Sequence, residues 1–331
     1  MELSGDRAII VLLLAAFIDF LIGDPWWRIP HPVQMMGWVI SRYKQMVVGD
    51  GKPPREFTSA IFLYSSGVFL TVALVVGSAW VGWSLVAVSH ACHPLLGMAI
   101  ESILLASCFA TNSLRRAAEE VLQPLLAGDF ATARSHLGIY VGRDTENLSE
   151  PEIYRAVLET VAENTVDAVT SPLFYAVVGS LLFPFGGVAL ALGFKAASTL
   201  DSMIGYKKPP VRELGWCGAR LDDVLTWLPC RLTVVTLGLL ARSPVRVWLA
   251  CQKEGHLDPS PNSGWSECAY ATILDVQLGG INTYGGVVKE KPRVGPPIDP
   301  ITDEKVYAAI RLMRWSFLLW LAAAIFLILA M

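Results

Sequence analysis

The C-terminal segment from Trp315 to Met331 contains no charged side chain, and Arg311 and Arg314 precede it. A helix of about 20 mostly apolar residues is long enough to cross the hydrocarbon core of a bilayer. Backbone polar groups inside that core must be paired with each other, so only helices or closed barrels can cross it. A long, continuously apolar segment favours a helix, and it predicts a transmembrane span at this end of the chain.

Other segments and the composition extend this prediction to the whole chain. Ala8 to Ile22, Phe57 to Val88 and Pro94 to Ala110 are long apolar runs that predict three further spans. Of the 331 residues, 53% are hydrophobic and 17% are charged, whereas about a quarter of the residues in a soluble domain are charged. The mean hydropathy is +0.48. We therefore expect a polytopic all-α membrane protein.

Two more apolar segments are interrupted by proline. Val166 to Leu200 contains Pro172 and the sequence PFGG at 184–187, and Val224 to Leu240 contains Pro229. Irregular helices are tolerated at membrane depth where protein covers them or where they line a cavity. We expect these two segments to form half-helices or re-entrant hairpins rather than straight spans.

The distribution of Lys and Arg predicts the orientation. These residues concentrate after the first span, after the third span and before the last span, and the positive-inside rule places all three loops in the cytoplasm. Four full spans satisfy this parity, with five or six left open. We expect a single domain over residues 1–331 in the cytoplasmic (inner) membrane, with cytoplasmic loops at about 24–56, 113–165, 201–223 and 242–314.

The segment RAVLETVAENTVDAV at 155–169 carries a charged stripe. Arg155, Glu159, Glu163 and Asp167 recur at every fourth position, so on a helix they share one face. The remaining positions are apolar nearly all round, which indicates a helix that is buried or partly in lipid. Solvated surface charges are the bland alternative, but buried carboxylates need a partner or a metal. The stripe, with Asn164 beside it, therefore predicts a functional site, and its carboxylates suit Mg²⁺ with phosphate.

Several shorter polar motifs lie next to the apolar segments. Asp24 and His31 each precede a proline and predict turns just beyond the first span, where Asp24 either caps a helix or binds a cation. The apolar run FKAASTLDSMIGYKK, from Phe194 to Lys208, contains Lys195 and Asp201. The motif ARLDD supplies Arg220, Asp222 and Asp223.

Two turn sequences, DPSPNSGW at 258–265 and LGGINTYGG at 278–286, are rich in Pro, Gly and Asn. Their backbone N–H groups are suited to phosphate, although as isolated turns they read as structural. The chain has neither a Walker A motif nor a GxGxxG fingerprint. A net charge of −3 argues against nucleic acid as a partner. Acids, a few cations and Gly-rich turns beside a membrane fit phosphate with Mg²⁺, without naming a substrate.

Taken together, the motifs identify a resemblance along nearly the whole chain. They occur in the order Asp19-x4-Asp24-Pro25 with His31-Pro32-Val33, GRDT from Gly142, ETVAENTVD from Glu159, TLDSMIGY from Thr199, ARLDD from Ala219, SPNSGW from Ser260 and QLGG from Gln277. This series resembles the adenosylcobinamide-phosphate synthase family (CobD/CbiB type) of cobalamin biosynthesis. The sequence departs from the family pattern at Thr170-Ser171 and at Cys230, and neither departure alters a charged residue.

The resemblance implies an ATP-dependent amide ligase that uses Mg²⁺. The family joins the propionate of adenosylcobyric acid to the amine of aminopropanol phosphate, or of a relative such as ethanolamine phosphate. The corrinoid is then a substrate and not a prosthetic group. We expect phosphoryl transfer to the propionate followed by attack of the amine, a reaction that depends mostly on positioning and charge neutralisation.

The resemblance also implies roles for the motif residues. A metal and phosphate site is expected from Glu159, Glu163 and Asp167 with Asp201, Asp222 or Asp223. Phosphate charge is expected to be neutralised by Arg143, Lys195 and Arg220, and Asp144 or His31 is expected to take the proton of the amine. Asn262 and Asn282 are expected to contact the substrate phosphate or the corrin amides. Asp24 and Asn164 complete the expected catalytic set, and Ser260 and Tyr206 the expected substrate-binding set.

Two other classes of function stay open from the sequence. A transporter for a corrinoid or an anion would also have broken helices and intramembrane charges. A non-catalytic membrane sensor would be expected to lose the acidic motifs, which this chain keeps. The expected partners are adenosylcobyric acid, the amino-alcohol phosphate and membrane lipid. A homo-oligomer and an association with other late cobalamin-pathway enzymes are left open.

Overall fold

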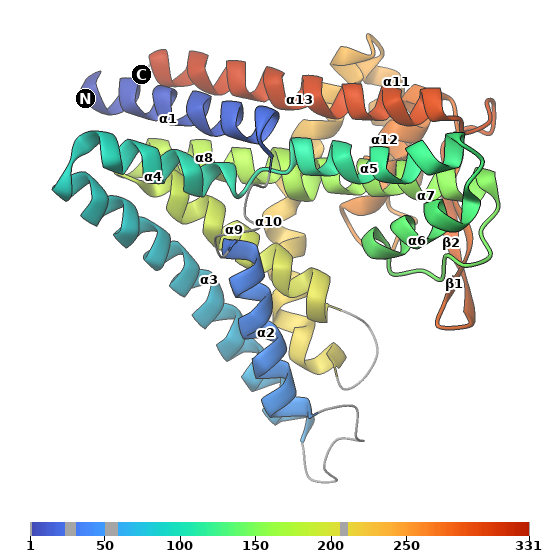
Figure 1. Ribbon diagram of the computed structural model, residues 1–331, viewed down its shortest axis with the longest axis horizontal. Helices are drawn as coiled ribbons and strands as arrows, with labels where there is room; N and C mark the ends of the chain where they lie inside the picture. Colours follow the sequence, from blue (N-terminus) through green and yellow to red (C-terminus); the bar gives the residue numbers. More distant parts are fainter. Residues whose placement is uncertain (1, 24–30, 50–58, 206–210, 331) are drawn as a thin grey trace. The chain divides into compact units, whose positions relative to one another are not determined.

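Helices dominate the structure, a computed structural model that describes residues 2–23, 31–49, 59–205 and 211–330 (Figure 1). One two-stranded hairpin is the only sheet in these ranges, so the all-α prediction is confirmed. Contacts group the chain into two compact units. Unit 1 comprises Met1–Ala110, Ser171–Leu225 and Leu321–Met331, and unit 2 comprises Thr111–Thr170 and Thr226–Trp320. The single-domain organisation stays a prediction.

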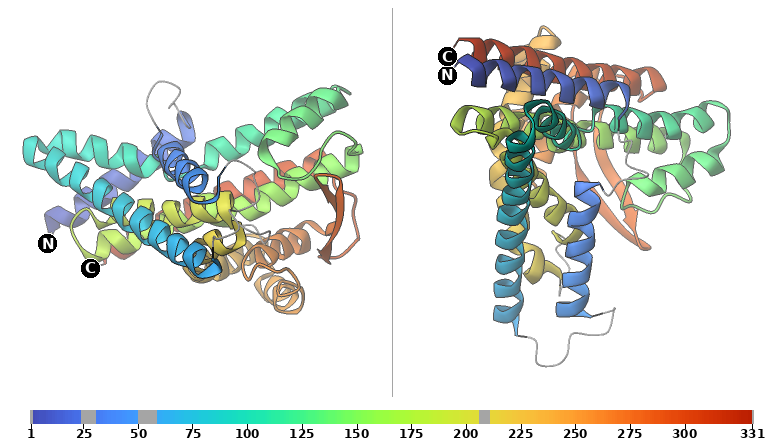
Figure 2. Two further views of the ribbon diagram at one scale, coloured as in Figure 1. Left: turned by 90° about the horizontal axis from the view of Figure 1, so that it is seen from below. Right: turned by 60° about the vertical axis from the view of Figure 1, so that its left-hand side comes forward.

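Unit 1 is built on the longest apolar helix of the described chain, α3. Its helices are α1 (Glu2–Leu21), α2 (Pro32–Val48), α3 (Ala60–Cys92), α4 (Pro94–Ala106), α8 (Ser171–Leu182), α9 (Gly186–Ile204) and the first half of α10 (Val211–Leu240). Helix α3 packs along α9 and beside α2 (Figure 2). At Gly82 of α3, a Cβ atom would lie 2.4 Å from Leu192 of α9. The absence of a side chain therefore allows the two helices to approach closely.

The segment predicted as broken at 166–200 forms a helical hairpin between α8 and α9. The break falls at the PFGG sequence, where Phe185 adopts φ +62°. A Cβ on Gly179 would lie 2.1 Å from the Gly186 carbonyl oxygen, and one on Gly186 would lie 2.2 Å from the Gly179 carbonyl oxygen. The prediction of two half-helices is confirmed at this position, because only glycine permits such close packing at the turn.

Proline acts differently in the two remaining places. Pro172 lies at the start of α8, directly after the π-helical turn Thr165–Thr170. The chain therefore stays helical on both sides of this proline. The prediction of a break at Pro229 is wrong, because α10 runs through it from Val211 to Leu240. A proline at 229 has no N–H for the Leu225 carbonyl. The Tyr175 hydroxyl donates a 2.8 Å hydrogen bond to that carbonyl and replaces the missing donor.

Unit 2 combines short helices with the hairpin. Its elements are α5 (Thr111–Leu126), α6 (Phe130–Tyr140), α7 (Glu150–Asn164), the π-helix η1 (Thr165–Thr170), the second half of α10, α11 (Pro244–Glu254), α12 (Ser263–Leu274), β1 (Leu278–Tyr284), β2 (Val287–Val294) and the first part of α13 (Asp303–Leu329). Helix α7 packs against α5, α6 and α12. It begins with the predicted capping box, in which the Glu152 side chain accepts a hydrogen bond from the Ser149 N–H.

The β1–β2 hairpin lies where the sequence predicted only a Gly-rich turn. The strands are antiparallel, with Gly280 opposite Lys291 and Asn282 opposite Lys289. Gly285 and Gly286 connect them with φ values of +57° and +76°. Two positive φ values are the requirement of a tight two-residue hairpin turn, and a Gly-Gly pair satisfies it at no steric cost.

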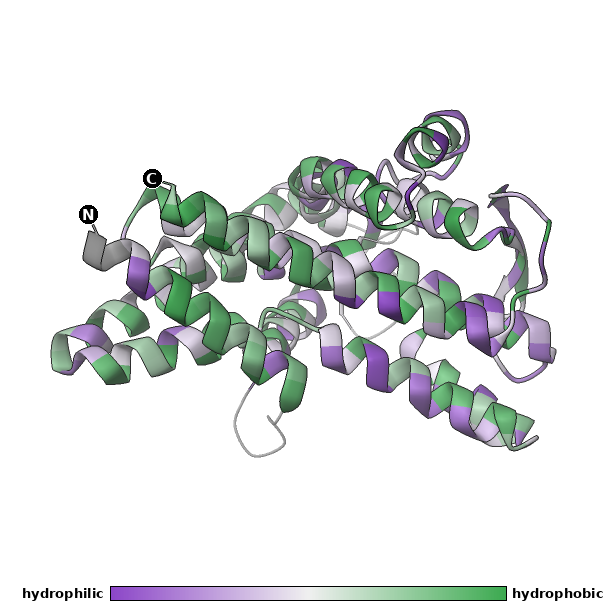
Figure 3. Ribbon diagram, turned by 90° about the horizontal axis from the view of Figure 1, so that it is seen from above, coloured by the Kyte–Doolittle hydropathy of each residue, from purple (hydrophilic) through white to green (hydrophobic). Residues whose placement is uncertain are grey.

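Five helical segments are long and apolar enough to cross a membrane, and the protein is a multi-pass membrane protein. They are Ala60–Cys92, Pro94–Leu126, Glu150–Leu182, Val211–Leu240 and Asp303–Leu329. In α13 the apolar residues occupy the C-terminal part and the polar residues the N-terminal part (Figure 3). Helix α1 is not among the five, since Asp6, Arg7 and Asp19 interrupt its apolar sequence. The span at 8–22 therefore stays a prediction.

Candidate functional site

The charged stripe of α7 faces the hairpin in unit 2, and Glu159 joins it both to the GRDT loop and to β1. Glu159 Oε2 accepts a 2.5 Å hydrogen bond from Arg143 Nη2, and Oε1 accepts a 2.9 Å bond from the Gly279 N–H. The side chains of Arg143 and Glu159 are 9% and 3% exposed. A buried carboxylate needs such partners. The GRDT loop, α7 and β1 are therefore joined at one carboxylate.

Arg155, one turn before Glu159, extends this network. Its Nη1 lies 3.6 Å from Glu159 Oε1 and donates to the Gly279 carbonyl. Its Nη2 donates to the Ile281 carbonyl at 3.0 Å and to Asn282 Oδ1 at 3.2 Å. Two guanidinium groups thus surround one carboxylate, which leaves an excess of positive charge at this level of α7.

Asn282 completes the cationic end of the site. Its Oδ1 also accepts a 2.9 Å hydrogen bond from Arg143 Nη1, and the residue is 3% exposed. Its amide nitrogen Nδ2 has no hydrogen-bond acceptor among the described residues. A buried donor without a partner is costly and is uncommon in native proteins. Nδ2 is therefore available to a ligand that supplies an acceptor oxygen.

A second charged group lies around Lys291 of β2. Lys291 Nζ lies 2.5 Å from Glu267 Oε1 on α12 and 3.6 Å from Asp258 Oδ2. Glu163 of α7 interacts electrostatically with Lys291, Asp258 and Glu159, and more weakly with Arg143. Unlike its neighbours on α7, Glu163 is exposed to solvent. Three carboxyl groups therefore surround one ammonium, and the group opens to water at Glu163.

The charges in this second group alter each other's protonation. Burial raises the pKa of Glu267 to about 8, although Lys291 opposes the shift. Burial opposes the ammonium form of Lys291, but Glu267 and Glu163 outweigh it and raise the pKa of Lys291 above its usual value. Lys291 therefore remains an ammonium, and its charge favours the ionised form of Glu267 against the effect of burial.

The SPNSGW motif at 260–265 is hydrogen-bonded to Arg231 of the sequence Pro229-Cys230-Arg231. Arg231 Nη1 donates to Asn262 Oδ1 at 2.6 Å, and Nη2 donates to the Pro261 carbonyl at 2.8 Å. The Ser260 hydroxyl accepts from the Ser263 N–H at 3.2 Å. The guanidinium also lies over the Trp265 ring at 4.5 Å. These contacts fix the loop before α12, and a substrate role for Ser260 and Asn262 stays a prediction.

Asp144, predicted as a base, supports the hairpin turn. Its two carboxylate oxygens each accept a 2.8 Å hydrogen bond, from the N–H groups of Gly285 and Gly286. The bonds from Gly286 and Gly285 hold the pKa of Asp144 below its usual value. A carboxylate with a lowered pKa is a weaker proton acceptor. The geometry favours a structural role, and the role as base stays a prediction.

The stripe does not continue as a straight α-helix to Asp167. Asp167 lies in the π-helical turn Thr165–Thr170, which follows the α-helical part of the stripe. Asn164 donates back to the Thr160 carbonyl at 2.9 Å. Within the described ranges, no three or more His, Cys, Asp or Glu side chains are arranged to hold a metal ion. The metal roles of Glu159, Glu163 and Asp167 stay predictions.

The remaining predicted residues belong to unit 1. His31 Nδ1 accepts from the Val33 N–H at 3.2 Å as the N-cap of α2. Arg220 lies 3.2 Å from Asp223. Lys195 and Asp201 are on α9, and Asp222 on α10 is buried. Asp24 and Tyr206 lie outside the described residues. That these residues share a site with unit 2 stays a prediction.

Five residues of the network were absent from the predicted site: Arg155, Arg231, Asp258, Glu267 and Lys291. Glu267 carried a usable signal, since it is the one acid in the otherwise apolar or small sequence SGWSECAYATIL. The same signal identified the acids of α7. Lys291 carried none, because a lysine in a basic loop is ordinarily solvated.

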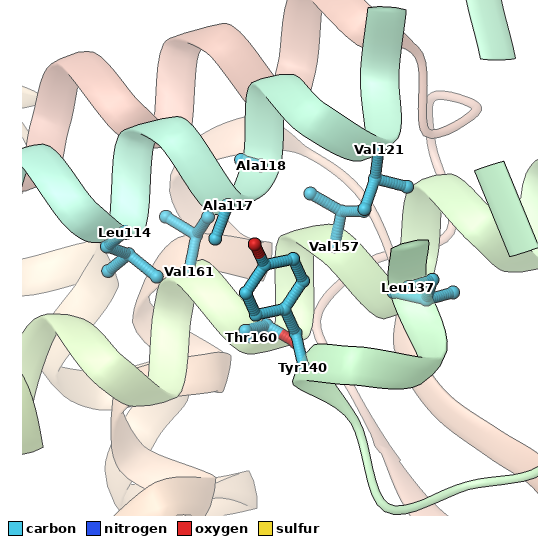
Figure 4. Close-up of a pocket in the computed structure, with 9 residues that line it drawn as sticks. All are labelled: Leu114, Ala117, Ala118, Val121, Leu137, Tyr140, Val157, Thr160 and Val161. Carbon is cyan, nitrogen blue, oxygen red and sulfur yellow. The ribbon is translucent and has the colours of Figure 1, made fainter. Parts of the chain in front are cut away.

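An apolar pocket lies nearby but does not suit charged chemistry (Figure 4). The Tyr140 hydroxyl donates to Glu120, and the Thr160 hydroxyl donates to the Ala156 carbonyl. No polar group is therefore left for a phosphate. The pocket lies between α5, α6 and α7 and is lined by Leu114, Ala117, Ala118, Val121, Leu137, Tyr140, Val157, Thr160 and Val161.

Comparisons with known proteins agree along the chain. The family model described as CobD/Cbib protein matches residues 12–313. The chain is 49% identical over 325 residues to "Cobalamin biosynthesis protein CobD" of Synechocystis sp., covering 98% of this chain and 92% of the relative. It is 39% identical over 312 residues to "Cobalamin biosynthesis protein CbiB" of Salmonella typhi, covering 92% of each. No solved structure matches the chain.

Proposed function

Since the chain belongs to the CobD/CbiB family of cobalamin biosynthesis proteins, we propose that it is adenosylcobinamide-phosphate synthase, an ATP-dependent amide ligase. The reaction joins adenosylcobyric acid to (R)-1-aminopropan-2-ol phosphate or to ethanolamine phosphate. Its product is adenosylcobinamide phosphate. The family membership shows a role in cobalamin biosynthesis, and the particular reaction is our proposal.

This proposal rests on two clusters of charged side chains that lie beside one face of α7. Arg143, Arg155 and Asn282 form an end with excess positive charge and an unpartnered donor. Glu163, Asp258 and Glu267 form an end with excess acid. The proposed amine substrate carries both a phosphate and an ammonium. Its binding site therefore needs a cationic end for the phosphate and an acidic end for the ammonium.

The chemistry of the proposed reaction sets what these residues must do. A carboxylate is a poor acceptor for an amine, and ATP supplies a phosphoryl group that converts the propionate into an acyl phosphate. The amine nitrogen then forms the amide bond while inorganic phosphate leaves, and the ammonium proton must be lost first. Arg143 and Arg155 are suited to holding anionic oxygens, since a guanidinium offers paired donors. The acids near Glu163 are suited to the ammonium.

The cellular setting follows as part of the proposal. The chain is a multi-pass membrane protein, and we place it in the cytoplasmic membrane with its site on the cytoplasmic side, where ATP is available. The corrinoid is a substrate. Membrane lipid is a partner, nucleic acid is not, and self-association or association with neighbouring pathway enzymes would keep the intermediates close.

The test uses the full chain purified in detergent. Adenosylcobyric acid, aminopropanol phosphate and Mg-ATP are supplied together, and the corrinoid is followed by mass spectrometry. We expect a product heavier by the amino-alcohol phosphate less one water, formed only when ATP is present. Absence of a product with every amine tried, despite bound corrinoid, would refute the ligase.

A matched pair of variants connects the activity to the site. We expect Glu163→Gln to abolish product formation while the protein remains folded. Glu290→Gln changes an exposed acid on β2 and should leave the rate unchanged. A fully active Glu163→Gln variant would remove this residue from the mechanism.

Transport is the second function that an observation favours, because the five candidate spans and the broken α8–α9 hairpin resemble the elements of a transporter. Vesicles that contain the protein would then show flux of labelled corrinoid. Flux without an ATP-dependent amide product would replace the ligase with this function.

A further inference from the structure

On the charged stripe of α7, from Arg155 to Glu163, the sign of the charge changes along the helix axis. Arg155, Glu159 and Glu163 follow each other at intervals of four residues, which correspond to about 6 Å of helix rise each. Cations exceed acids around Glu159, and acids exceed cations around Glu163. The reversal therefore occurs within about one helical turn.

The cationic end holds more donors than its single carboxylate can use. Arg143 and Arg155 both contact Glu159, which leaves one positive charge in excess. A Cβ on Gly280 would lie 3.8 Å from Arg155 Nη1 and 3.8 Å from Arg293 Nε, so a third guanidinium borders this end. The 97% buried Asn282 adds the unpartnered Nδ2 donor. These groups together are suited to the oxygens of a phosphate.

The acidic end is left with a negative charge. Lys291 is held by Glu267 and Asp258, and Glu163 interacts with it from α7. Three carboxyl groups, those of Glu267, Asp258 and Glu163, therefore lie around the one ammonium of Lys291. An incoming ammonium would balance this excess.

Solvent access shows from which end a ligand can reach the site. The side chains of Glu267 and Glu159 are 1% and 3% exposed, whereas Glu163 is exposed. Charged groups on α12, on β2 and in the loop before α12 all act on Glu163. Glu163 is therefore surrounded by charge yet exposed at the surface of unit 2, where a ligand can reach it.

We propose that this face of α7 binds a small zwitterion, with its phosphate at Arg143, Arg155 and Asn282 and its primary ammonium at Glu163 and Asp258. The inference rests on the proposed function, and it adds which substrate occupies the site and in which orientation. A phosphate and an ammonium separated by a short amino-alcohol chain match two ends of opposite charge about one helical turn apart.

Direct binding tests the inference without the ligation reaction. Isothermal titration of the full chain in detergent uses O-phosphoethanolamine as the zwitterion, ethyl phosphate as the phosphate end and ethanolamine as the ammonium end. We expect O-phosphoethanolamine to bind about tenfold or more tightly than either single-ended probe, since each charge-assisted hydrogen bond contributes affinity. Equal binding of ethyl phosphate, or no binding of the zwitterion at millimolar concentration, overturns the inference.

Two variants assign the ends. Glu163→Gln should weaken O-phosphoethanolamine about tenfold and leave ethyl phosphate unchanged. Asn282→Asp retains the oxygen that accepts from both arginines but replaces the Nδ2 donor with a charged oxygen, so it should weaken both phosphate probes and not ethanolamine. Glu290→Gln is the control that should change neither. Thermal unfolding verifies the fold, and variants that affect both single-ended probes alike overturn the orientation.

The outcomes separate this inference from the proposed function. Selective zwitterion binding without an amide product in the ligase assay would leave the subsite standing and refute the ligase. If Glu163→Gln and Asn282→Asp change neither amide formation nor zwitterion binding, the ligase stands and the subsite is refuted.

Discussion

Arg143 and Glu159 form a 2.5 Å ion pair that joins the GRDT loop to α7, with both side chains almost excluded from solvent. The sequence separates them by one loop and the start of a helix. Their contact also fixes the hairpin, because Glu159 binds the Gly279 N–H and Arg143 binds Asn282. The stability and the chemistry of unit 2 therefore depend on the same residues.

Removing Arg143 should destabilise unit 2. Loss of Arg143 removes the shorter of the two ion pairs of the buried Glu159, which keeps Arg155 at 3.6 Å, and we expect a cost of up to about 3 kcal/mol. We expect Arg143→Ala to lower the thermal unfolding midpoint strongly, and Arg116→Ala, an exposed arginine on α5, to change it little. Arg143→Ala combined with Glu159→Gln should cost less than the sum of the single changes. Strict additivity would show that the pair is not coupled.

The hairpin turn should lose protection at low pH. Hydrogen bonds from Gly286 and Gly285 lower the pKa of Asp144 below its unfolded value of about 3.9. The stabilisation is therefore present above about pH 4 and is lost as the pH falls through the folded pKa. Hydrogen exchange of the two glycine amides, corrected for intrinsic rates, measures it. Asp144→Asn should exchange faster and show no such pH dependence; an unchanged pH dependence in Asp144→Asn would exclude the carboxylate.

The Tyr175 hydroxyl should matter only while residue 229 is proline. Tyr175→Phe leaves the Leu225 carbonyl without a donor, at a cost of about 1 kcal/mol. Pro229→Ala restores a backbone N–H to that carbonyl. We therefore expect Tyr175→Phe to lower the unfolding midpoint in the natural sequence and to have little effect in the Pro229→Ala background. Equal effects in both backgrounds would assign the loss to ring packing instead.

Glu267 should make the protein less stable as the pH rises. Burial raises its pKa from 4.5 to about 8, so the folded state holds a proton that the unfolded state releases. This contribution is fully present below about pH 4.5 and is lost as the pH approaches 8 and above. Glu267→Gln keeps an uncharged partner for Lys291 and should flatten the decline of the unfolding midpoint between these pH values. A variant with the same slope as the natural protein would show that another group titrates.

The sequence by itself determined the class of the fold and the membership of the family. Long apolar segments must be helices in a bilayer, because no water is available to the backbone. The PFGG break and the Ser149 capping box were also predicted, since both depend on local backbone chemistry. The acids of α7 were recognised because charges on an otherwise apolar helix need a reason.

Only the tertiary structure decided what those acids contact. Glu159 is held by residues 16 and 120 positions away in the chain, and Lys291 reaches Glu267 from a hairpin where the sequence predicted only a turn. Local pattern also failed at Pro229, where a tyrosine from α8 replaces the missing donor, and it did not predict the π-helical turn that contains Asp167. Such contacts depend on how elements distant in sequence pack, and helical periodicity carries no information about them.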